Sequence, residues 1–131
     1  MSFTTATYPG TGARNTEAFH YSQAVKVGSI IKTSGQGGWD TEGNIVADTT
    51  AQIAKAMENV LTALQAVDAS VTWRNVYSIK SYHTDLDATF DVMVEQMRTV
   101  MPDHKPIWTC VQIGKLGIEG MAIEIAVEAA V

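Results

Sequence analysis

The chain has 131 residues, of which 46% are hydrophobic and 18% charged, and its formal net charge is −5. This length fits one domain over residues 1–131, and the composition supports a packed core and excludes a disordered chain. The few, scattered Lys and Arg residues exclude the basic surface that binding to nucleic acid or to an anionic membrane requires.

The first part of the chain predicts a hairpin followed by loops. Residues 1–20 are rich in Thr, Gly and small polar side chains and are expected to be irregular, with at most one short strand. The runs 24–27 and 30–33 flank a Gly-Ser pair, which is typical of a tight β-hairpin. A glycine-rich stretch over residues 34–38 follows, and residues 39–44 are expected to form an exposed loop.

The second part predicts two amphipathic helices among three strands. Asp48 or Thr49 can cap a helix that ends near Val67, and its apolar positions form one stripe. Asp85 or Asp87 can open a second helix, which a proline at position 102 stops. The strands are expected at residues 76–82, 107–113 and 121–127.

The predicted order is β-β-α-β-α-β-β, which indicates an α+β sheet with two helices on one face. The glycine spacings of the Rossmann and P-loop folds are absent from the sequence, and no cofactor is expected. A sheet covered on one face leaves its other face in need of a partner, so self-association is expected.

The expected location of the protein is the cytoplasm. Cys110 is the single cysteine, which excludes an internal disulfide and favours a reducing compartment. The first ten residues lack the basic and apolar regions of a signal peptide, and no stretch has the length of a membrane span.

The histidines predict no metal site, because His20, His83 and His104 share no ligand spacing with one another or with a carboxylate cluster. For His83, at a strand-to-helix corner, a capping or surface role is favoured. Cys110 lies in an apolar run and is read as a small hydrophobic residue. For the glycine-rich stretch 34–38, an ordinary turn is favoured over a nest that binds an anion.

Glu124 is the most informative polar residue, since it interrupts the apolar run 122–127. Its carboxylate lies either on a solvated face or in a cleft, and the sequence favours neither. In a cleft, burial would raise its pKa and suit it to general acid–base chemistry.

Three stretches together resemble the Rid family, also called YjgF-like and formerly L-PSP endoribonucleases. The first is Tyr21-Ser22-Gln23-Ala24-Val25 with Thr33-Ser34-Gly35-Gln36, the second is the helix around residues 53–61, and the third is Pro106 to Glu124. The resemblance implies a chorismate-mutase-like fold assembled as a homotrimer, with clefts between subunits that bind a small molecule. It also implies hydrolysis of reactive enamines and imines, such as 2-aminoacrylate, to 2-oxo acids and ammonia.

Carried over by position, the resemblance assigns a catalytic role to Glu124, which would position the attacking water. It assigns substrate binding to Tyr21, Ser34, Gly35, Cys110 and, in place of an asparagine, Asp91. The important departure is Trp108, which occupies the position of the arginine that grips the substrate carboxylate. An indole cannot replace a bidentate guanidinium–carboxylate contact. The loop 116–120 is also one residue longer than in the family and lacks its proline.

These features predict an enzyme of the Rid family with an altered substrate. We expect hydrolytic deamination, or related acid–base chemistry, on an enamine, an imine or an apolar or aromatic metabolite, and little activity on 2-aminoacrylate. The alternative is a metabolite-binding or regulatory trimer that uses the same cleft without turnover. A ribonuclease is disfavoured by the net charge of −5.

Overall fold

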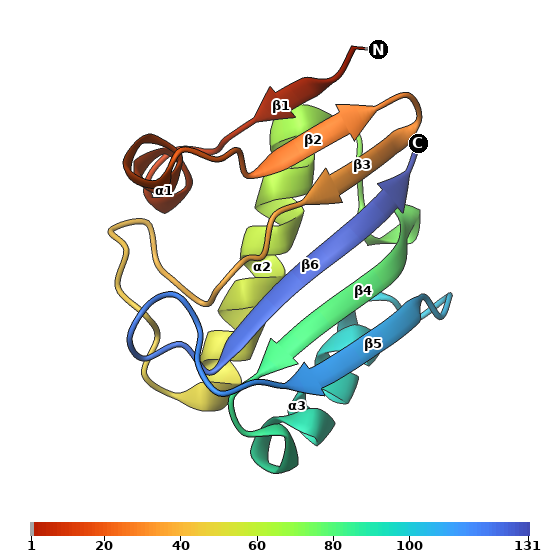
Figure 1. Ribbon diagram of the computed structural model, residues 1–131. Helices are drawn as coiled ribbons and strands as arrows, with labels where there is room; N and C mark the ends of the chain where they lie inside the picture. The colour runs from red at the N-terminus through yellow and green to blue at the C-terminus, as the bar shows by residue number, and fades with distance from the viewer. Residues whose placement is uncertain (1) are drawn as a thin grey trace.

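The computed structural model describes residues 2–131 and shows one six-stranded sheet in the order β1-β2-β3-β6-β4-β5 (Figure 1). All neighbouring strands are antiparallel except β4 and β5, which are parallel. The strands are β1 (Thr4–Ala6), β2 (Ala24–Val27), β3 (Ile30–Thr33), β4 (Val76–His83), β5 (Ile107–Gln112) and β6 (Ile123–Ala130). The helices are α1 (Thr11–Phe19), α2 (Thr49–Val67) and α3 (Leu86–Val100), with a 3₁₀ turn, η1, at Trp73–Asn75.

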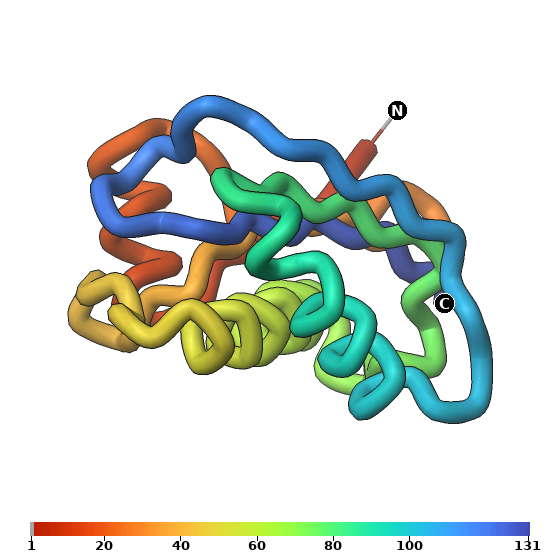
Figure 2. The backbone as a smooth tube through the Cα atoms, turned by 90° about the horizontal axis from the view of Figure 1, so that it is seen from below, coloured from red at the N-terminus to blue at the C-terminus, as the bar shows by residue number. Residues whose placement is uncertain are grey.

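The expected α+β fold is confirmed, and two helices cover one face of the sheet. Figure 2 shows α2 and α3 together beneath the sheet, with α1 at one end. The core lies between these layers, where the apolar stripe of α2 meets the inward side chains of β6. The fully buried members include Ile53, Val60, Leu64, Ile123 and Ile125.

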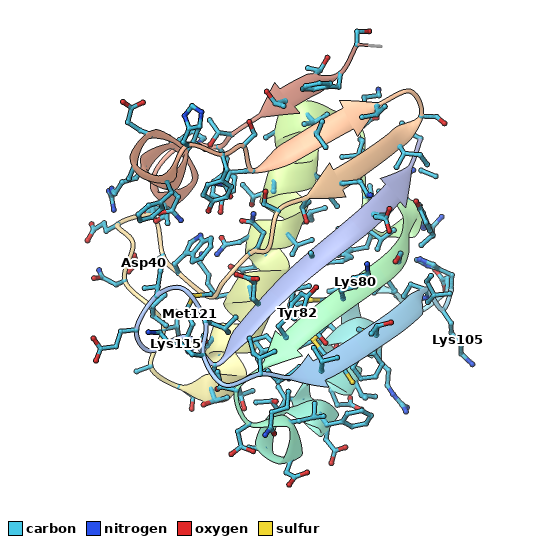
Figure 3. The ribbon with its side chains drawn as sticks, viewed as in Figure 1. Asp40, Lys80, Tyr82, Lys105, Lys115 and Met121 are labelled. Carbon is cyan, nitrogen blue, oxygen red and sulfur yellow. The ribbon has the colours of Figure 1, made fainter. Side chains whose placement is uncertain are left out.

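The two faces of the sheet differ because strand side chains alternate. On β6, Ile123, Ile125, Val127 and Ala129 are buried on the helix-covered face, whereas Glu124, Ala126 and Glu128 are only partly buried. Glu124 lies opposite Tyr82 of β4 in the strand register. We call the face that carries Glu124 and Tyr82 the open face. Figure 3 labels Lys80 and Tyr82 on β4, on the side of the sheet away from α2.

The predicted helix caps are confirmed, and the limits of the elements shift by a few residues. Asp48 accepts a hydrogen bond from the amide of Ala51 at 2.9 Å, and Asp85 accepts one from the amide of Ala88 at 3.2 Å. Strand β6 begins later and ends later than expected, at Ile123–Ala130.

The expectation of an irregular segment over residues 1–20 is wrong, because this segment contains helix α1 as well as the short strand β1. The expected exposed loop after Gly38 is wrong at its first residue, since Trp39 is buried with 3% of its surface exposed. In residues 2–131, no helix is both long enough and apolar enough to cross a membrane.

Candidate functional site

A pocket of about 260 Å³ lies at the end of the sheet where β6 begins. Helix α1, the segment after β3 and the loop between β5 and β6 meet there, as Figure 1 shows. Met121 of that loop, which lines the pocket, is labelled in Figure 3. The lining residues are Asn15, Phe19, Tyr21, Gly35, Trp39, Gly117, Ile118, Met121 and Glu124.

The carboxyl group of Glu124 rests directly against Gly35. A side chain added at Gly35 would place its Cβ atom 2.4 Å from the Glu124 carboxyl carbon, which is closer than real contacts allow. The backbone explains this proximity, because Gln36 and Ile125 exchange both amide–carbonyl hydrogen bonds, at 2.8 and 3.0 Å. The glycine therefore provides the room in which the carboxyl group lies.

Burial raises the pKa of Glu124 above its ordinary value. No ion pair in residues 2–131 compensates the charge of Glu124, and the neighbouring Tyr21, Trp39 and Met121 are largely apolar. A carboxyl group in such surroundings exchanges protons closer to neutral pH than a solvated one. The pocket thus holds one group suited to general acid–base chemistry.

A buried hydrogen-bond network supports the wall of the pocket. The hydroxyl of Tyr8 donates to Gln36 Oε1 at 2.6 Å and accepts from Trp39 Nε1 at 3.0 Å. Gln36 Nε2 in turn donates to Gln23 Oε1 at 2.9 Å. Burial raises the pKa of Tyr8 to about 12, so its hydroxyl stays protonated as the network requires. This network fixes the strand end that carries Gly35.

The structure brings together Tyr21, Gly35 and Glu124, three of the residues predicted from the sequence. Ser34 is their neighbour in the chain, but its hydroxyl donates to the carbonyl of Ser22 at 2.6 Å. Its backbone amide also bonds to the carbonyl of Gln23, at 2.9 Å. Ser34 therefore ties two segments together and does not line the pocket.

Trp108 and Cys110 lie on the opposite face of the sheet from Glu124. Trp108 is paired with Ile79 and Cys110 with Ser81, and paired residues share a face. Ile79 and Ser81 are buried on the helix-covered face. Trp108 packs against Phe90 of α3 and lines a groove of about 480 Å³ with Met97 and Met101. Within one chain, the indole therefore does not meet Glu124.

Asp91 is exposed on α3 and lines neither the pocket nor the groove beside Trp108.

The sequence favoured a capping or surface role for His83, but this residue is fully buried between Ser81 and Thr89. The capping role at this corner belongs to Asp85 alone. In residues 2–131, no three or more His, Cys, Asp or Glu side chains are grouped as metal ligands would be.

Sequence reasoning missed six lining residues of the pocket. Asn15 and Phe19 were missed because α1 was not predicted, and Trp39 because it was placed in an exposed loop. The other three, Gly117, Ile118 and Met121, come from the loop between β5 and β6. The signal that could have found Trp39 is its indole directly after a run of glycines, since small residues allow a large ring to pack on the backbone. Gly37 does this, since an added Cβ there would lie 2.6 Å from the Trp39 ring.

Comparison with known proteins gives consistent matches over nearly the whole chain. The family described as endoribonuclease L-PSP matches residues 12–131. The chain is 31% identical over 125 residues to the RutC family protein YjgH of Escherichia coli (strain K12), covering 94% of this chain and 92% of that protein.

A mitochondrial relative and a solved structure are also similar. The mitochondrial protein mmf2 of Schizosaccharomyces pombe (strain 972 / ATCC 24843) is 30% identical over 109 residues, which cover 82% of this chain and 83% of that protein. The crystal structure of RidA from the Antarctic bacterium Psychrobacter sp. PAMC 21119 is 27% identical, with a TM-score of 0.81. This match covers 100% of this chain and 99% of that one.

Proposed function

The chain belongs to the endoribonuclease L-PSP family, which is the Rid or YjgF-like family, and we propose that it is a small-molecule enzyme of that family. Its reaction is hydrolysis of a carbon–nitrogen bond in an enamine or imine, or closely related acid–base chemistry. The observation that carries this proposal is the Glu124 carboxyl group, which lies against Gly35 with its pKa raised by burial.

The proposed reaction needs one group that moves protons in both directions. An enamine first becomes its imine tautomer, and water then adds to the imine carbon. The Glu124 carboxylate takes a proton from that water as it adds and passes it to the nitrogen, which gives a carbinolamine. The carboxylate then takes the hydroxyl proton of the carbinolamine and passes it to the nitrogen, so that ammonia leaves and a carbonyl compound remains. A carboxyl group whose pKa is raised by burial suits both transfers, because it accepts a proton more readily than a solvated carboxylate and can return it in the next step.

The complete cleft in this proposal lies between two copies of the chain in a homotrimer. One copy contributes Tyr21, Gly35 and Glu124, which share one pocket. The second copy contributes Trp108 and Cys110 from β5, a strand at the edge of the sheet. Within one chain, Glu124 and Trp108 lie on opposite faces of the sheet. A neighbouring copy could place its own Trp108 beside Glu124, and this supports a cleft between subunits.

The ligand class follows from Trp108. An indole offers a large apolar surface and no positive charge, so it favours an apolar or aromatic metabolite over a small carboxylate. Neither a cofactor nor nucleic acid has a part in the proposed reaction. The cytoplasm remains the proposed location, although the matched relative mmf2 is named as mitochondrial.

The test compares deamination of imines generated in the assay by an amino-acid oxidase acting on phenylalanine and on alanine. Ammonia release is followed with the wild-type protein, with Glu124→Gln and with Glu128→Gln. Glu128 is a matched control, because it lies on the same strand and face but is paired with Lys32 at 3.2 Å.

Glu124→Gln is expected to lower turnover by about a hundredfold or more with little change in KM, since proton transfer typically contributes 10²–10⁴-fold. Glu128→Gln is expected to keep the wild-type rate. Full activity of Glu124→Gln would remove this carboxyl group from the mechanism. Saturable binding of the product oxo acid without turnover of any imine would favour the non-catalytic alternative, a metabolite-binding or regulatory trimer.

A further inference from the structure

A row of buried polar side chains lies beneath the sheet where β4 faces α3. Ser81, His83 and Thr89 each have 1% or less of their surface exposed. Polar groups buried so deeply are costly unless they are hydrogen-bonded. Hydrogen bonds link Thr89 to His83 and His83 to Ser81, and the row ends at the indole of Trp108.

The donors and acceptors in this row allow one direction only. Thr89 donates its single hydroxyl hydrogen to the carbonyl of Asp85 at 2.7 Å, and a carbonyl can only accept. The Thr89 oxygen, 2.7 Å from His83 Nδ1, must therefore accept from that nitrogen. This contact assigns the ring proton of neutral His83 to Nδ1.

The second ring nitrogen of His83, Nε2, accepts a hydrogen bond, so the donors and acceptors keep the same order along the row. With Nδ1 protonated, Nε2 carries a lone pair, and the hydroxyl of Ser81, at 2.8 Å, donates to it. The same Ser81 oxygen accepts from Trp108 Nε1 at 2.9 Å. Each hydrogen in the row has one acceptor, and the direction of each hydrogen bond determines the direction of the next one.

A protonated His83 does not fit this row. An imidazolium would donate from both nitrogens, so the Ser81 oxygen would face two donors, and the Ser81 hydrogen would lose its acceptor. Burial also lowers the pKa of His83, which agrees with a neutral ring. The neutral ring with Nδ1 protonated is thus the state that satisfies every partner.

The row has a direct consequence for Trp108. An indole has a single hydrogen-bond donor, and here that donor is directed into the protein toward Ser81. Phe90 holds the ring from the α3 side, with ring centroids 5.2 Å apart and planes at 36°. The exposed part of the half-buried Trp108 ring therefore consists of carbon atoms.

We propose that Thr89, His83 and Ser81 act as a positioning relay for Trp108, which holds the indole N–H inward and makes this wall of the cleft selective for uncharged, apolar groups. The selectivity rests on the proposed function, because Trp108 must line the cleft. The relay itself does not, since all its bonds lie within one chain. Ser81, His83 and Thr89 touch neither substrate nor reacting atoms and act only through Trp108.

The first test needs no variant. Long-range ¹H–¹⁵N spectra of the wild-type protein near neutral pH distinguish the two neutral tautomers of each histidine ring. We expect His83, assigned by comparison with His83→Gln, to be neutral with the proton on Nδ1. A proton on Nε2, or an imidazolium, would overturn the relay.

The second test follows the indole N–H signals of the three tryptophans in the ligand-free protein. In Ser81→Ala, the Trp108 N–H is expected to shift and to exchange with solvent at least about tenfold faster, because a buried bond is lost. The Trp39 N–H is the internal control, since it donates to Tyr8 on another part of the sheet.

A matched pair at Thr89 separates positioning from general damage to the core. Thr89→Val has nearly the same shape but no hydroxyl, and it is expected to disturb the Trp108 signal. Thr89→Ser keeps the hydroxyl and is expected to restore the wild-type signal. An unchanged Trp108 signal in both Ser81→Ala and Thr89→Val would overturn the proposal. None of these measurements depends on turnover, so failure of the proposed enzyme activity would leave them interpretable.

Discussion

Burial of Glu124 disfavours its charged form, and this makes its contribution to stability depend on pH. Its folded-state pKa is raised above 4.5 by burial. Well below pH 4.5, the carboxyl group is protonated in both folded and unfolded chains. As pH rises through the folded-state pKa, the unfolded chain releases the proton more readily, and the folded state loses stability relative to it.

Glu124→Gln removes this ionisation while keeping the shape of the side chain. We expect the variant to gain stability relative to the wild type at about pH 8 and to gain little at about pH 4. Urea unfolding at the two pH values measures the difference. An equal difference at both pH values would contradict a raised pKa.

Trp108 leads to a second expectation at the residue scale. Loss of a charged bidentate contact to a carboxylate costs about 2–5 kcal/mol, which corresponds to ~30-fold to several-thousand-fold weaker binding. We therefore expect very low activity on 2-aminoacrylate, generated by a coupled dehydratase, and a gain of activity in Trp108→Arg. Wild-type turnover equal to that of a relative that carries the arginine would show that another group holds the carboxylate.

At the scale of elements, helix α1 is the part of the fold that depends most on tertiary contacts. Its N-cap is Gly10, which offers no side chain to the free amides, and its first turn has no acidic residue. The helix is held from outside instead: Thr11 and Arg14 donate to backbone carbonyls of the segment after β3, those of Asp40 and Glu42. Tyr8 also packs against Gly12, where an added Cβ would lie 2.7 Å from its ring.

Tyr8 joins this helix region to the end of β3, and its hydroxyl serves two buried partners at once. Tyr8→Phe would leave Gln36 Oε1 and Trp39 Nε1 without their hydrogen bonds. Each unsatisfied group typically costs about 1–3 kcal/mol, so we expect a clear loss in the free energy of unfolding, measured with urea. Tyr77→Phe, at an exposed tyrosine, is the control and should change little. Equal stability of Tyr8→Phe and the wild type would show that the network is not needed.

The contrast among these elements explains how far the sequence could be interpreted. Helices α2 and α3 were predictable because each carries its own signals, an aspartate cap and an apolar stripe. Helix α1 was not, because its stability lies in contacts with residues far away in the chain. The same holds in part for Trp39, whose ring lies against the nearby Gly37 but whose indole N–H is bonded to Tyr8, far away in the chain.

Some residues of the candidate site could be predicted from the sequence, and others could not. Residue types and the resemblance to a family indicated Tyr21, Gly35 and Glu124, and the structure places all three around one pocket. The position of Trp108 could not be obtained from the sequence, because strand alternation alone does not say which face is covered. That depends on the register of β5 against β4, where Trp108 is paired with the buried Ile79.

At the scale of the whole molecule, the open face of the sheet predicts association. It exposes Ile107 and Val111 of β5, with 71% and 39% of their surfaces accessible. A neighbouring copy of the chain would bury these side chains, so we expect a homotrimer in solution. Light scattering of the wild-type protein at micromolar concentration measures the assembly, and a monomer there would contradict it.

A charged substitution tests which surface associates. Val111→Glu places a carboxylate on the open face and is expected to shift the protein toward monomers. Phe3→Glu is the matched control, because Phe3 is also an exposed large apolar residue but precedes β1 at the far edge of the sheet. If Phe3→Glu dissociated the protein and Val111→Glu did not, the association would use another surface.

The central place of β6 constrains how the protein can be made on the ribosome. Strand β6 is the last strand described, yet it pairs with both β3 and β4 in the middle of the sheet. A nascent chain that has emerged only as far as β5 holds two half-sheets, β1–β3 and β4–β5, with no ladder between them. Translation must therefore reach residues 123–130 before the native sheet can close, and a premature stop codon before them removes the junction rather than an edge.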